Sequence, residues 1–157
     1  MIKNFKKNYI IVGGAILILI LALVNHRNTP AVVDISSVGA VRIAGETVNV
    51  DLALDQSTQE RGLSGRDGLS PDQGMLFVFN SPAKYGFWMK DMNFPIDIIW
   101  LSADKRVVYI EKSAEPASYP EIFTPPEDAL YVLEVISGFS EKNNLSAGDQ
   151  AEFLSSK

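Results

Sequence analysis

The sequence predicts an all-β domain, a mainly antiparallel sandwich or open barrel with one or two short helices, preceded by one N-terminal transmembrane helix. Two observations support this prediction. Short apolar runs of strand length alternate with turn residues from residue 41 to residue 154, while helix signals are few. One long apolar segment without charge lies near the N-terminus, and 157 residues suffice for one domain of ordinary size and this appendage.

The N-terminal apolar segment covers residues 9–24, YIIVGGAILILILALV. A helix of this length spans roughly 24 Å, which approaches the thickness of the hydrocarbon core of a membrane. No A-x-A-like cleavage pattern follows, so we interpret the segment as an uncleaved signal anchor. The basic tail of residues 1–8 favours a cytoplasmic N-terminus. The C-terminal domain of this single-pass protein is then expected outside the cytoplasmic membrane, in the periplasm or at the cell surface.

Residues 25–40 are small and polar with no clear period, so we expect a linker, followed by the β domain over residues 41–157. The runs VRI (41–43) and TVNVDLAL (47–54) predict a first hairpin across the turn AGE. Alternation places four residues of its second strand on one face, namely Val48, Val50, Leu52 and Leu54. The run MLFVF (75–79) is apolar throughout, which predicts a strand covered on both faces.

A second hairpin is predicted from PIDIIWL (95–101) and VVYIE (107–111), which the polar residues SADKR connect. Residues 112–129 contain four prolines and are therefore predicted to form a long loop. The runs LYVLEVI (130–136) and AEFL (151–154) predict the remaining strands.

Two short helices are expected between these strands. Ser57 followed by Glu60 has the spacing of a capping box, and Gly62 or Gly65 would end this helix within two turns. Residues 140–144 indicate one further helical turn.

Composition argues against several classes of function. Residues 40–157 contain ten Lys and Arg against eighteen Asp and Glu, and such an acidic surface disfavours nucleic acid as a partner. The chain has no cysteine, and its one histidine, His26, lies beside the apolar segment, so a zinc site or a cysteine nucleophile is not expected. No nucleotide-binding, zinc-hydrolase or EF-hand motif is present, and we predict no metal, no cofactor and no catalytic residue.

Three charged residues interrupt apolar strands. Strand parity places Asp97 and Glu134 on otherwise apolar faces, and it places Lys90 beside Trp88 in FWMK. A charge that is buried in this way needs a partner. The candidate cations are Lys90 itself and the two arginines of RGLSGR, Arg61 and Arg66.

Three interpretations of these charges remain open. They form an internal network of salt bridges and hydrogen bonds that fixes the short helix and its loop to the sheet, or they are exposed at strand ends. In the remaining interpretation they surround a small polar pocket walled by aromatic and sulfur-containing side chains. The candidate ligand-binding residues are then Arg61, Arg66, Trp88, Met89, Lys90, Asp97 and Glu134.

Several motifs follow one another in a distinctive order: ERGLSGR (60–66), GMLFVF (74–79), FWMKDM with PIDIIW (87–100), PPEDALYVLEV (125–135) and Gly148-Asp149. This order resembles that of the domain-of-unknown-function 192 family of bacterial and archaeal proteins. The resemblance covers about residues 45–154. It implies a compact, mainly β domain, often preceded by a signal or anchor segment, with no established biochemical activity.

The resemblance also marks individual positions. The family's typical residues fall on Arg61, Gly62, Leu63, Arg66, Gly74, Met75, Phe77, Phe79, Trp88, Met89, Lys90, Pro95, Asp97, Glu134 and Gly148. Relatives commonly have Asn-Thr where this chain has Asp91 and Met92, and many have cysteines where it has Ala117 and Ser118. A function that depends on those cysteines is therefore not expected here.

We expect a non-enzymatic binding or interaction domain, held at the membrane through residues 9–24, whose partner is an unknown small ligand or an envelope protein. One alternative is an enzyme that acts on an envelope carbohydrate or peptide through the carboxylates of Asp97 and Glu134. Another is a structural subunit of an envelope complex that binds through a flat β face or through the loop at residues 112–129.

Overall fold

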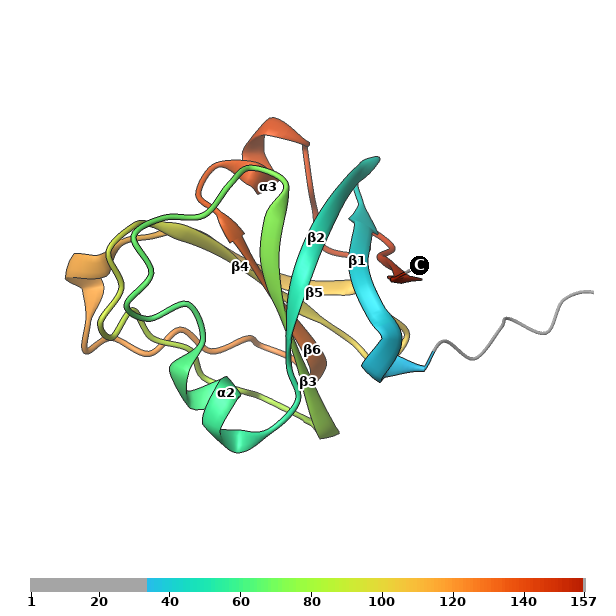
Figure 1. Cartoon of the computed structure of the whole chain (residues 1–157), viewed down its shortest axis with the longest axis horizontal. Helices are drawn as coiled ribbons and strands as arrows, with labels where there is room; N and C mark the ends of the chain where they lie inside the picture. The colour runs from blue at the N-terminus through green and yellow to red at the C-terminus, as the bar shows by residue number, and fades with distance from the viewer. Residues whose placement is uncertain (1–33, 157) are drawn as a thin grey trace, which may run out of the picture. The chain divides into compact units, whose positions relative to one another are not determined.

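The computed structural model describes residues 34–156 (Figure 1). The predicted tail (1–8), the predicted anchor (9–24) and most of the predicted linker (25–40) lie outside the described residues. Between residues 34 and 156, no helix is both long enough and apolar enough to cross a membrane.

The described domain is a mainly β structure with one seven-stranded sheet and two short α-helices, as the sequence predicts in outline. The strands are β1 (Val38–Ile43), β2 (Glu46–Ala53), β3 (Gln73–Ala83), β4 (Ile96–Leu101), β5 (Val107–Ala114), β6 (Ala129–Ile136) and β7 (Glu152–Ser155). The helices are η1 (Ile35–Ser37), α2 (Gln56–Arg61), η2 (Pro116–Ser118) and α3 (Phe139–Lys142). The strand order is β5-β4-β6-β3-β2-β1-β7, in which only β2 and β3 pair in parallel.

The two edges of the sheet approach each other at one end. Arg106 forms an isolated β-bridge with Gln150, just before β7. Val107 at the start of β5 also donates its N–H to the carbonyl of Asp149 (2.9 Å) and accepts a hydrogen bond from the N–H of Gly148 (2.7 Å). One curled sheet with joined edges is closer to the open barrel than to the two-sheet sandwich among the predicted alternatives.

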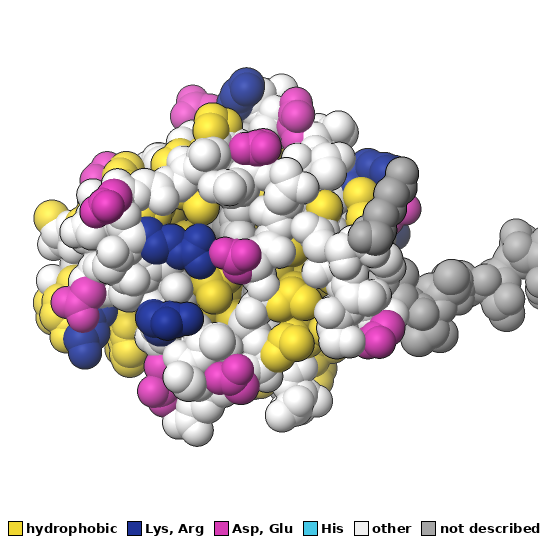
Figure 2. Space-filling view, in the orientation of Figure 1, with side chains coloured by type: hydrophobic (Ala, Val, Ile, Leu, Met, Phe, Trp, Pro, Cys, Tyr) yellow, Lys and Arg dark blue, Asp and Glu magenta, His cyan; other side chains and the backbone are white. Residues whose placement is uncertain are grey.

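Basic and acidic side chains are interspersed on the face of the domain shown in Figure 2. Two ion pairs, Arg42 with Glu152 and Arg66 with Asp51, each have an N···O distance of 2.8 Å. All four side chains are substantially exposed, so each pair is expected to contribute only about 0–1 kcal/mol to stability.

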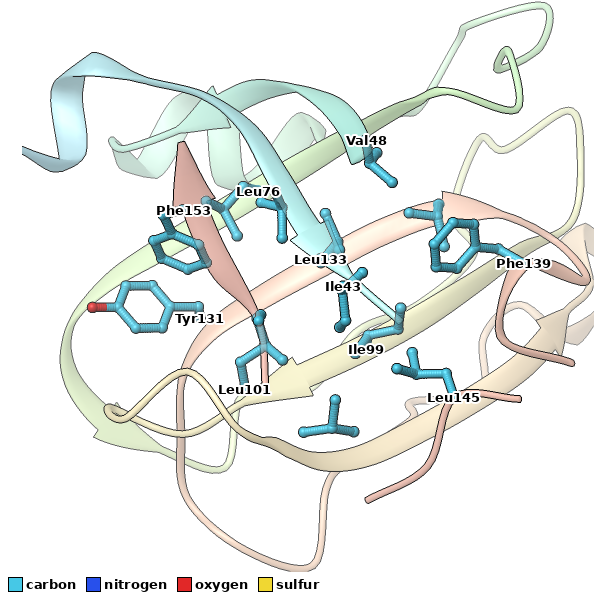
Figure 3. Packing of buried hydrophobic residues seen from close by; sticks show 14 of the residues in the cluster. Ile43, Val48, Leu76, Ile99, Leu101, Tyr131, Leu133, Phe139, Leu145 and Phe153 are labelled. Atoms are coloured by element: carbon cyan, nitrogen blue, oxygen red, sulfur yellow. The ribbon is translucent and has the colours of Figure 1, made fainter. Parts of the chain in front are cut away.

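One hydrophobic core fills the inside of the curled sheet (Figure 3). Alternate residues of the strands point into it, and the rings of Tyr131 and Phe153 meet edge to face with centroids 4.9 Å apart. Phe139 of α3 and Leu145 cover one side of this core. The buried strand residues are Val38, Val41, Ile43, Val48, Leu76, Ile99, Leu101, Val107, Tyr131, Leu133, Val135 and Phe153.

A second core lies on the opposite face of the central strands, because the residues of opposite parity are also buried. The strand residues in it include Ala53, Met75, Phe77, Ile96, Ile98, Trp100 and Val132. They are covered by side chains from the segments between the strands, namely Leu63, Met89, Met92 and Phe94. Coverage on both faces explains why MLFVF, and IDIIWL apart from Asp97, are apolar without alternation.

Both predicted hairpins are confirmed, since β1 pairs with β2 and β4 pairs with β5, each in antiparallel register. Val48 is buried in the first core, and Val50 and Leu52 pack against it. The prediction is wrong for Leu54, which follows the end of β2 and is 45% exposed. The predicted long loop (112–129) is confirmed for residues 115–128, apart from the single turn of η2, whereas residues 112–114 belong to β5 and Ala129 begins β6.

Two further local predictions are wrong. The helix begins after Asp55, whose carboxylate accepts the N–H of Thr58 while the Thr58 hydroxyl accepts the N–H of Asp55, so Ser57 and Glu60 do not form the capping box. The run FWMK is a loop in which Phe87 alone forms a β-bridge, with Phe123.

Gly74 provides a test of how tightly β3 and β6 pack. A Cβ at this position would lie 2.7 Å from the carbonyl oxygen of Glu134 and 3.0 Å from Cγ1 of Val48. We expect Gly74→Ala to lower the free energy of unfolding by about 1–3 kcal/mol, because the backbone of β6 cannot move without breaking strand pairing. Urea denaturation of the full-length chain measures this loss. Gly68→Ala is the control, because a Cβ there has no heavy atom within 4 Å, and equal stability of the two variants would contradict the prediction.

Candidate ligand-binding site

The short helix α2 is fixed at both ends and along its length. Asp55 caps its first turn, and this hydrogen bond from the backbone of Thr58 lowers the pKa of the Asp55 carboxyl. Nε2 of Gln59 donates to the carbonyls of Ala53 (3.3 Å) and Val78 (2.9 Å) and thereby holds the helix to β2 and β3. Gly62 ends the helix at φ 51° and ψ −132°, a conformation that favours glycine. These contacts therefore fix the position of α2 and of Gly62 relative to the second core.

Glu134 lies close to Gly62 at the end of α2. It pairs with Met75 on β3 and with Ile98 on β4, so its side chain emerges on the face of the second core. Glu134 is 5% exposed, and its Oε2 atom has no hydrogen-bond partner in the described part of the chain. A Cβ built on Gly62 would lie 3.7 Å from that oxygen. The same Cβ would lie 3.3 Å from Cζ of Phe77, so glycine allows the backbone at the end of α2 to lie close to both side chains.

Burial raises the pKa of Glu134 to about 8, against an ordinary value of 4.5, because an ionised carboxylate loses its hydration inside the protein. The positive charge of Arg66 opposes this shift only in part. At neutral pH the group is therefore mostly protonated and can donate one hydrogen bond and accept others.

An open hollow of about 210 Å³ lies over Glu134, and we call it the Glu134 hollow. Its aromatic lining consists of Phe77, Phe79, Tyr85, Phe87 and Trp88. Its polar and charged lining consists of Gln56, Gln59, Glu60, Arg61, Ser64 and Glu134, and the remaining lining residues are Gly62, Leu63, Gly86 and Met92.

Aromatic side chains that line the Glu134 hollow pack against one another in pairs. Phe77 and Phe87 meet edge to face with centroids 4.9 Å apart, and Phe79 and Tyr85 stack with centroids 3.5 Å apart. Trp88 is the exception, with 47% of its surface exposed. Four of the aromatic side chains of the hollow are therefore held in place by packing, whereas the exposed Trp88 is free to change its environment when a ligand binds.

Of the predicted site residues, three line the hollow: Arg61, Trp88 and Glu134. Met89 is 1% exposed and belongs to the second core, and Lys90 is exposed in a turn, so the charge of Lys90 needs no partner. Arg66 pairs with Asp51 beside a separate shallow hollow, although its charge still acts on Glu134. Arg66, Met89 and Lys90 therefore do not line the Glu134 hollow.

Asp97 has a different role. It is fully buried, and its carboxylate accepts hydrogen bonds from the backbone N–H groups of Ser113 (2.9 Å), Gly138 (3.2 Å) and Ser140 (2.8 Å). Because Asp97 pairs with Val135 while Ile98 pairs with Glu134, the two carboxyl groups emerge on opposite faces of the sheet. They therefore cannot act together on one substrate.

Sequence reasoning missed the residues that shape the hollow, namely Gln59, Phe77, Phe79, Tyr85 and Phe87. The only available signal was their position within or beside the motifs ERGLSGR, GMLFVF and FWMK. Apolar residues in strands are usually core residues, so the aromatic side chains gave no separate indication of a site. In the described part of the chain, no group of three or more His, Cys, Asp or Glu residues is placed to hold a metal ion.

Comparison with known proteins identifies similar sequences and structures. The sequence model of the domain-of-unknown-function 192 (DUF192) family, described as "Uncharacterized ACR", matches residues 39–153. A protein from Sinorhizobium meliloti 1021, described as "a putative transcription regulator", is 34% identical, with 73% of this chain and 92% of that chain covered and a TM-score of 0.68. A protein of unknown function from Novosphingobium aromaticivorans DSM 12444 is 30% identical, with 79% and 92% covered and a TM-score of 0.70. No curated protein matches this chain.

Proposed function

This chain belongs to the domain-of-unknown-function 192 family, and we propose that its domain binds a small ligand in the Glu134 hollow while residues 9–24 anchor it on the outer side of the cytoplasmic membrane. The proposal is that of a non-enzymatic binding module. The volume of about 210 Å³ lies below the ~300–1,000 Å³ of sites for drug-sized molecules, so the ligand is small.

The unpartnered carboxyl of Glu134 is the observation that carries this proposal. A buried polar group without a hydrogen bond costs about 1–3 kcal/mol, and a leucine at this position would avoid that cost in a purely structural role. Glu134 is also a lining residue of an open hollow with aromatic walls, although its Oε2 atom is buried. A few polar groups within an apolar concave surface are typical of a ligand site.

The alternative functions have less support. An enzyme that uses Asp97 and Glu134 as a pair is disfavoured, because the two side chains lie on opposite faces of the sheet. The description of the Sinorhizobium meliloti protein concerns transcription, but the acidic balance of this domain and the interspersed charges in Figure 2 are unfavourable for DNA binding. Binding to another envelope subunit has no comparable feature in its favour.

Trp88 fluorescence provides a direct test. The chain has two tryptophans, and Trp100 is fully buried with its indole N–H bonded to the carbonyl of Tyr85, so a ligand in the hollow should alter the emission of Trp88 in particular. We expect a ligand from a panel of small amines, alcohols, sugars and carboxylates to change this emission in the full-length chain, purified in detergent. The same ligand should raise the melting temperature, with a stabilisation of roughly 2.7 kcal/mol at a hundredfold excess over Kd.

Trp88→Phe is the matched control for this experiment. It should abolish the fluorescence change while the ligand still raises the melting temperature. If no member of the panel changes either signal at millimolar concentration, the binding proposal is wrong.

A further inference from the structure

Several polar groups of the Glu134 hollow offer hydrogen-bond acceptors, because their own donors are already engaged, whereas Arg61 and the indole N–H of Trp88 are donors among its lining residues. Nε2 of Gln59 contacts two backbone carbonyls, which leaves its Oε1 as the free atom and also fixes the orientation of the amide. The hydroxyl of Ser64 donates to the carbonyl of Lys90 (2.8 Å), and the hydroxyl of Tyr85 donates to the carbonyl of Ser81 (2.6 Å). A ligand that supplies several donors would complement these atoms.

The carboxyl of Glu134 is the most buried of these acceptors, and no cationic side chain in the described part of the chain forms an ion pair with it. Arg66, which acts on Glu134 at a distance, is paired with Asp51, and Arg61 at the end of α2 is exposed to solvent, which screens its charge. Neither arginine forms an ion pair with Glu134 in the described part of the chain. The position of a counter-ion beside this carboxyl is therefore left to the ligand.

The aromatic side chains favour the same ligand charge. The faces of aromatic rings carry negative potential and attract cations, with a contribution of about 0.5–2 kcal/mol that grows when water is excluded. Phe77, Phe87 and Trp88 line the hollow beside the carboxyl. They would contact the methylene groups or the ring of an organic cation, while a strongly hydrated metal ion would gain little from them.

We propose that the Glu134 hollow binds a small organic ammonium ion, with the Glu134 carboxylate as its counter-ion, Gln59 Oε1 as a second acceptor and the aromatic walls around its apolar body. This inference rests on the proposed binding function and specifies its ligand class. An ammonium group supplies three donors and one positive charge, which matches the acceptors that the hollow presents.

Binding of such a cation is coupled to release of a proton. Glu134 is mostly protonated at pH 7, and it must ionise to pair with the ammonium group. One proton therefore leaves for each cation bound at pH values well below 8, whereas a neutral alcohol would bind without proton release. By linkage, the affinity for the cation should increase about tenfold for each pH unit from pH 6 to pH 7 and level off above pH 8.

Isothermal titration calorimetry of the full-length chain with benzylamine, benzyl alcohol and benzoate tests this inference. Measurements in phosphate and in PIPES, which has no primary ammonium group, differ at pH 7 by the ionisation enthalpy of the buffer and so count the protons released. We expect benzylamine to bind at least tenfold more tightly than the other two and to release close to one proton. Glu134→Gln should weaken benzylamine binding about tenfold or more and abolish the proton release, whereas Glu127→Gln, an exposed change of the same charge, should alter neither.

The outcomes separate this inference from the function on which it rests. If benzyl alcohol or benzoate binds as tightly as benzylamine and changes Trp88 emission, the domain binds small ligands but the ammonium inference is wrong. If benzylamine binds without proton release, or binds equally to the Glu134→Gln variant, the carboxylate is not its counter-ion. If neither these compounds nor the wider panel bind, both proposals fail.

Discussion

Asp97→Asn should lower the free energy of unfolding by about 3–5 kcal/mol. The carboxylate accepts hydrogen bonds from three backbone N–H groups, and hydrogen bonds to a charged acceptor contribute about 1.5–3 kcal/mol each. The amide of asparagine can turn its oxygen toward Ser113 and Gly138 only by turning its NH₂ group toward the N–H of Ser140. One donor is then unsatisfied and faces another donor, and the negative charge is lost.

The effect should be large because α3 has no cap of its own. Its N-cap residue is Gly138, which has no side chain to accept the first helical N–H groups, and Asp97 replaces that cap from the neighbouring strand β4. The same carboxylate holds Ser113 of β5, so the bonds from one side chain join three elements. Loss of these bonds would also loosen Phe139, which covers the first core.

Urea denaturation of the full-length chain at pH 7 measures this loss. Asp67→Asn is the matched control, because it removes the same charge from an exposed position and should change stability by less than about 0.5 kcal/mol. Equal stability of the Asp97 and Asp67 variants would show that α3 does not depend on its cap from β4.

The contrast between Asp97 and Glu134 shows how far the sequence determines the site. Alternation along strands correctly predicts that both carboxyl groups lie on buried faces. It cannot predict that Asp97 meets backbone N–H donors while Oε2 of Glu134 has no partner in the described part of the chain. The donors for Asp97 come from residues 16 to 43 positions away in the chain. Asp97 thus has a structural role, although through backbone N–H groups and not through the predicted salt bridges, and Lys90 is exposed. For Glu134, which lines a hollow, the pocket interpretation stays a prediction.

Lys90 and the start of α2 show where local patterns are insufficient. Alternation correctly predicts that Trp88 and Lys90 point away from Met89, but the run is a loop, so the outward face is exposed to water and not to a second layer. Asp55 and Ser57 both have a suitable residue three positions later for a capping box. The helix that begins after Asp55 allows Gln59 to reach the carbonyls of β2 and β3. These tertiary hydrogen bonds favour a helix start at Asp55 over one at Ser57.

Glu134 should make the stability of the wild-type protein decrease as pH rises. The pKa of this group is about 8 in the folded protein and close to 4.5 in the unfolded chain, so the folded state binds the proton more tightly between these values. The free energy of unfolding therefore falls from about pH 4.5 to about pH 8 through this group and is constant above. Each pKa unit corresponds to about 1.4 kcal/mol, so the total change is on the order of 5 kcal/mol.

Glu134→Gln removes this titration and isolates it from all other groups. The variant should gain stability relative to the wild type steadily from pH 5 to pH 8, because glutamine keeps the size of the side chain and never acquires a buried charge. Urea denaturation of both full-length proteins at each pH measures the difference, and Glu127→Gln, at an exposed site, should give a difference that does not change with pH. Parallel stability curves for wild type and Glu134→Gln would mean that the carboxyl is hydrated in solution, and a hydrated carboxyl would not need a ligand as its partner.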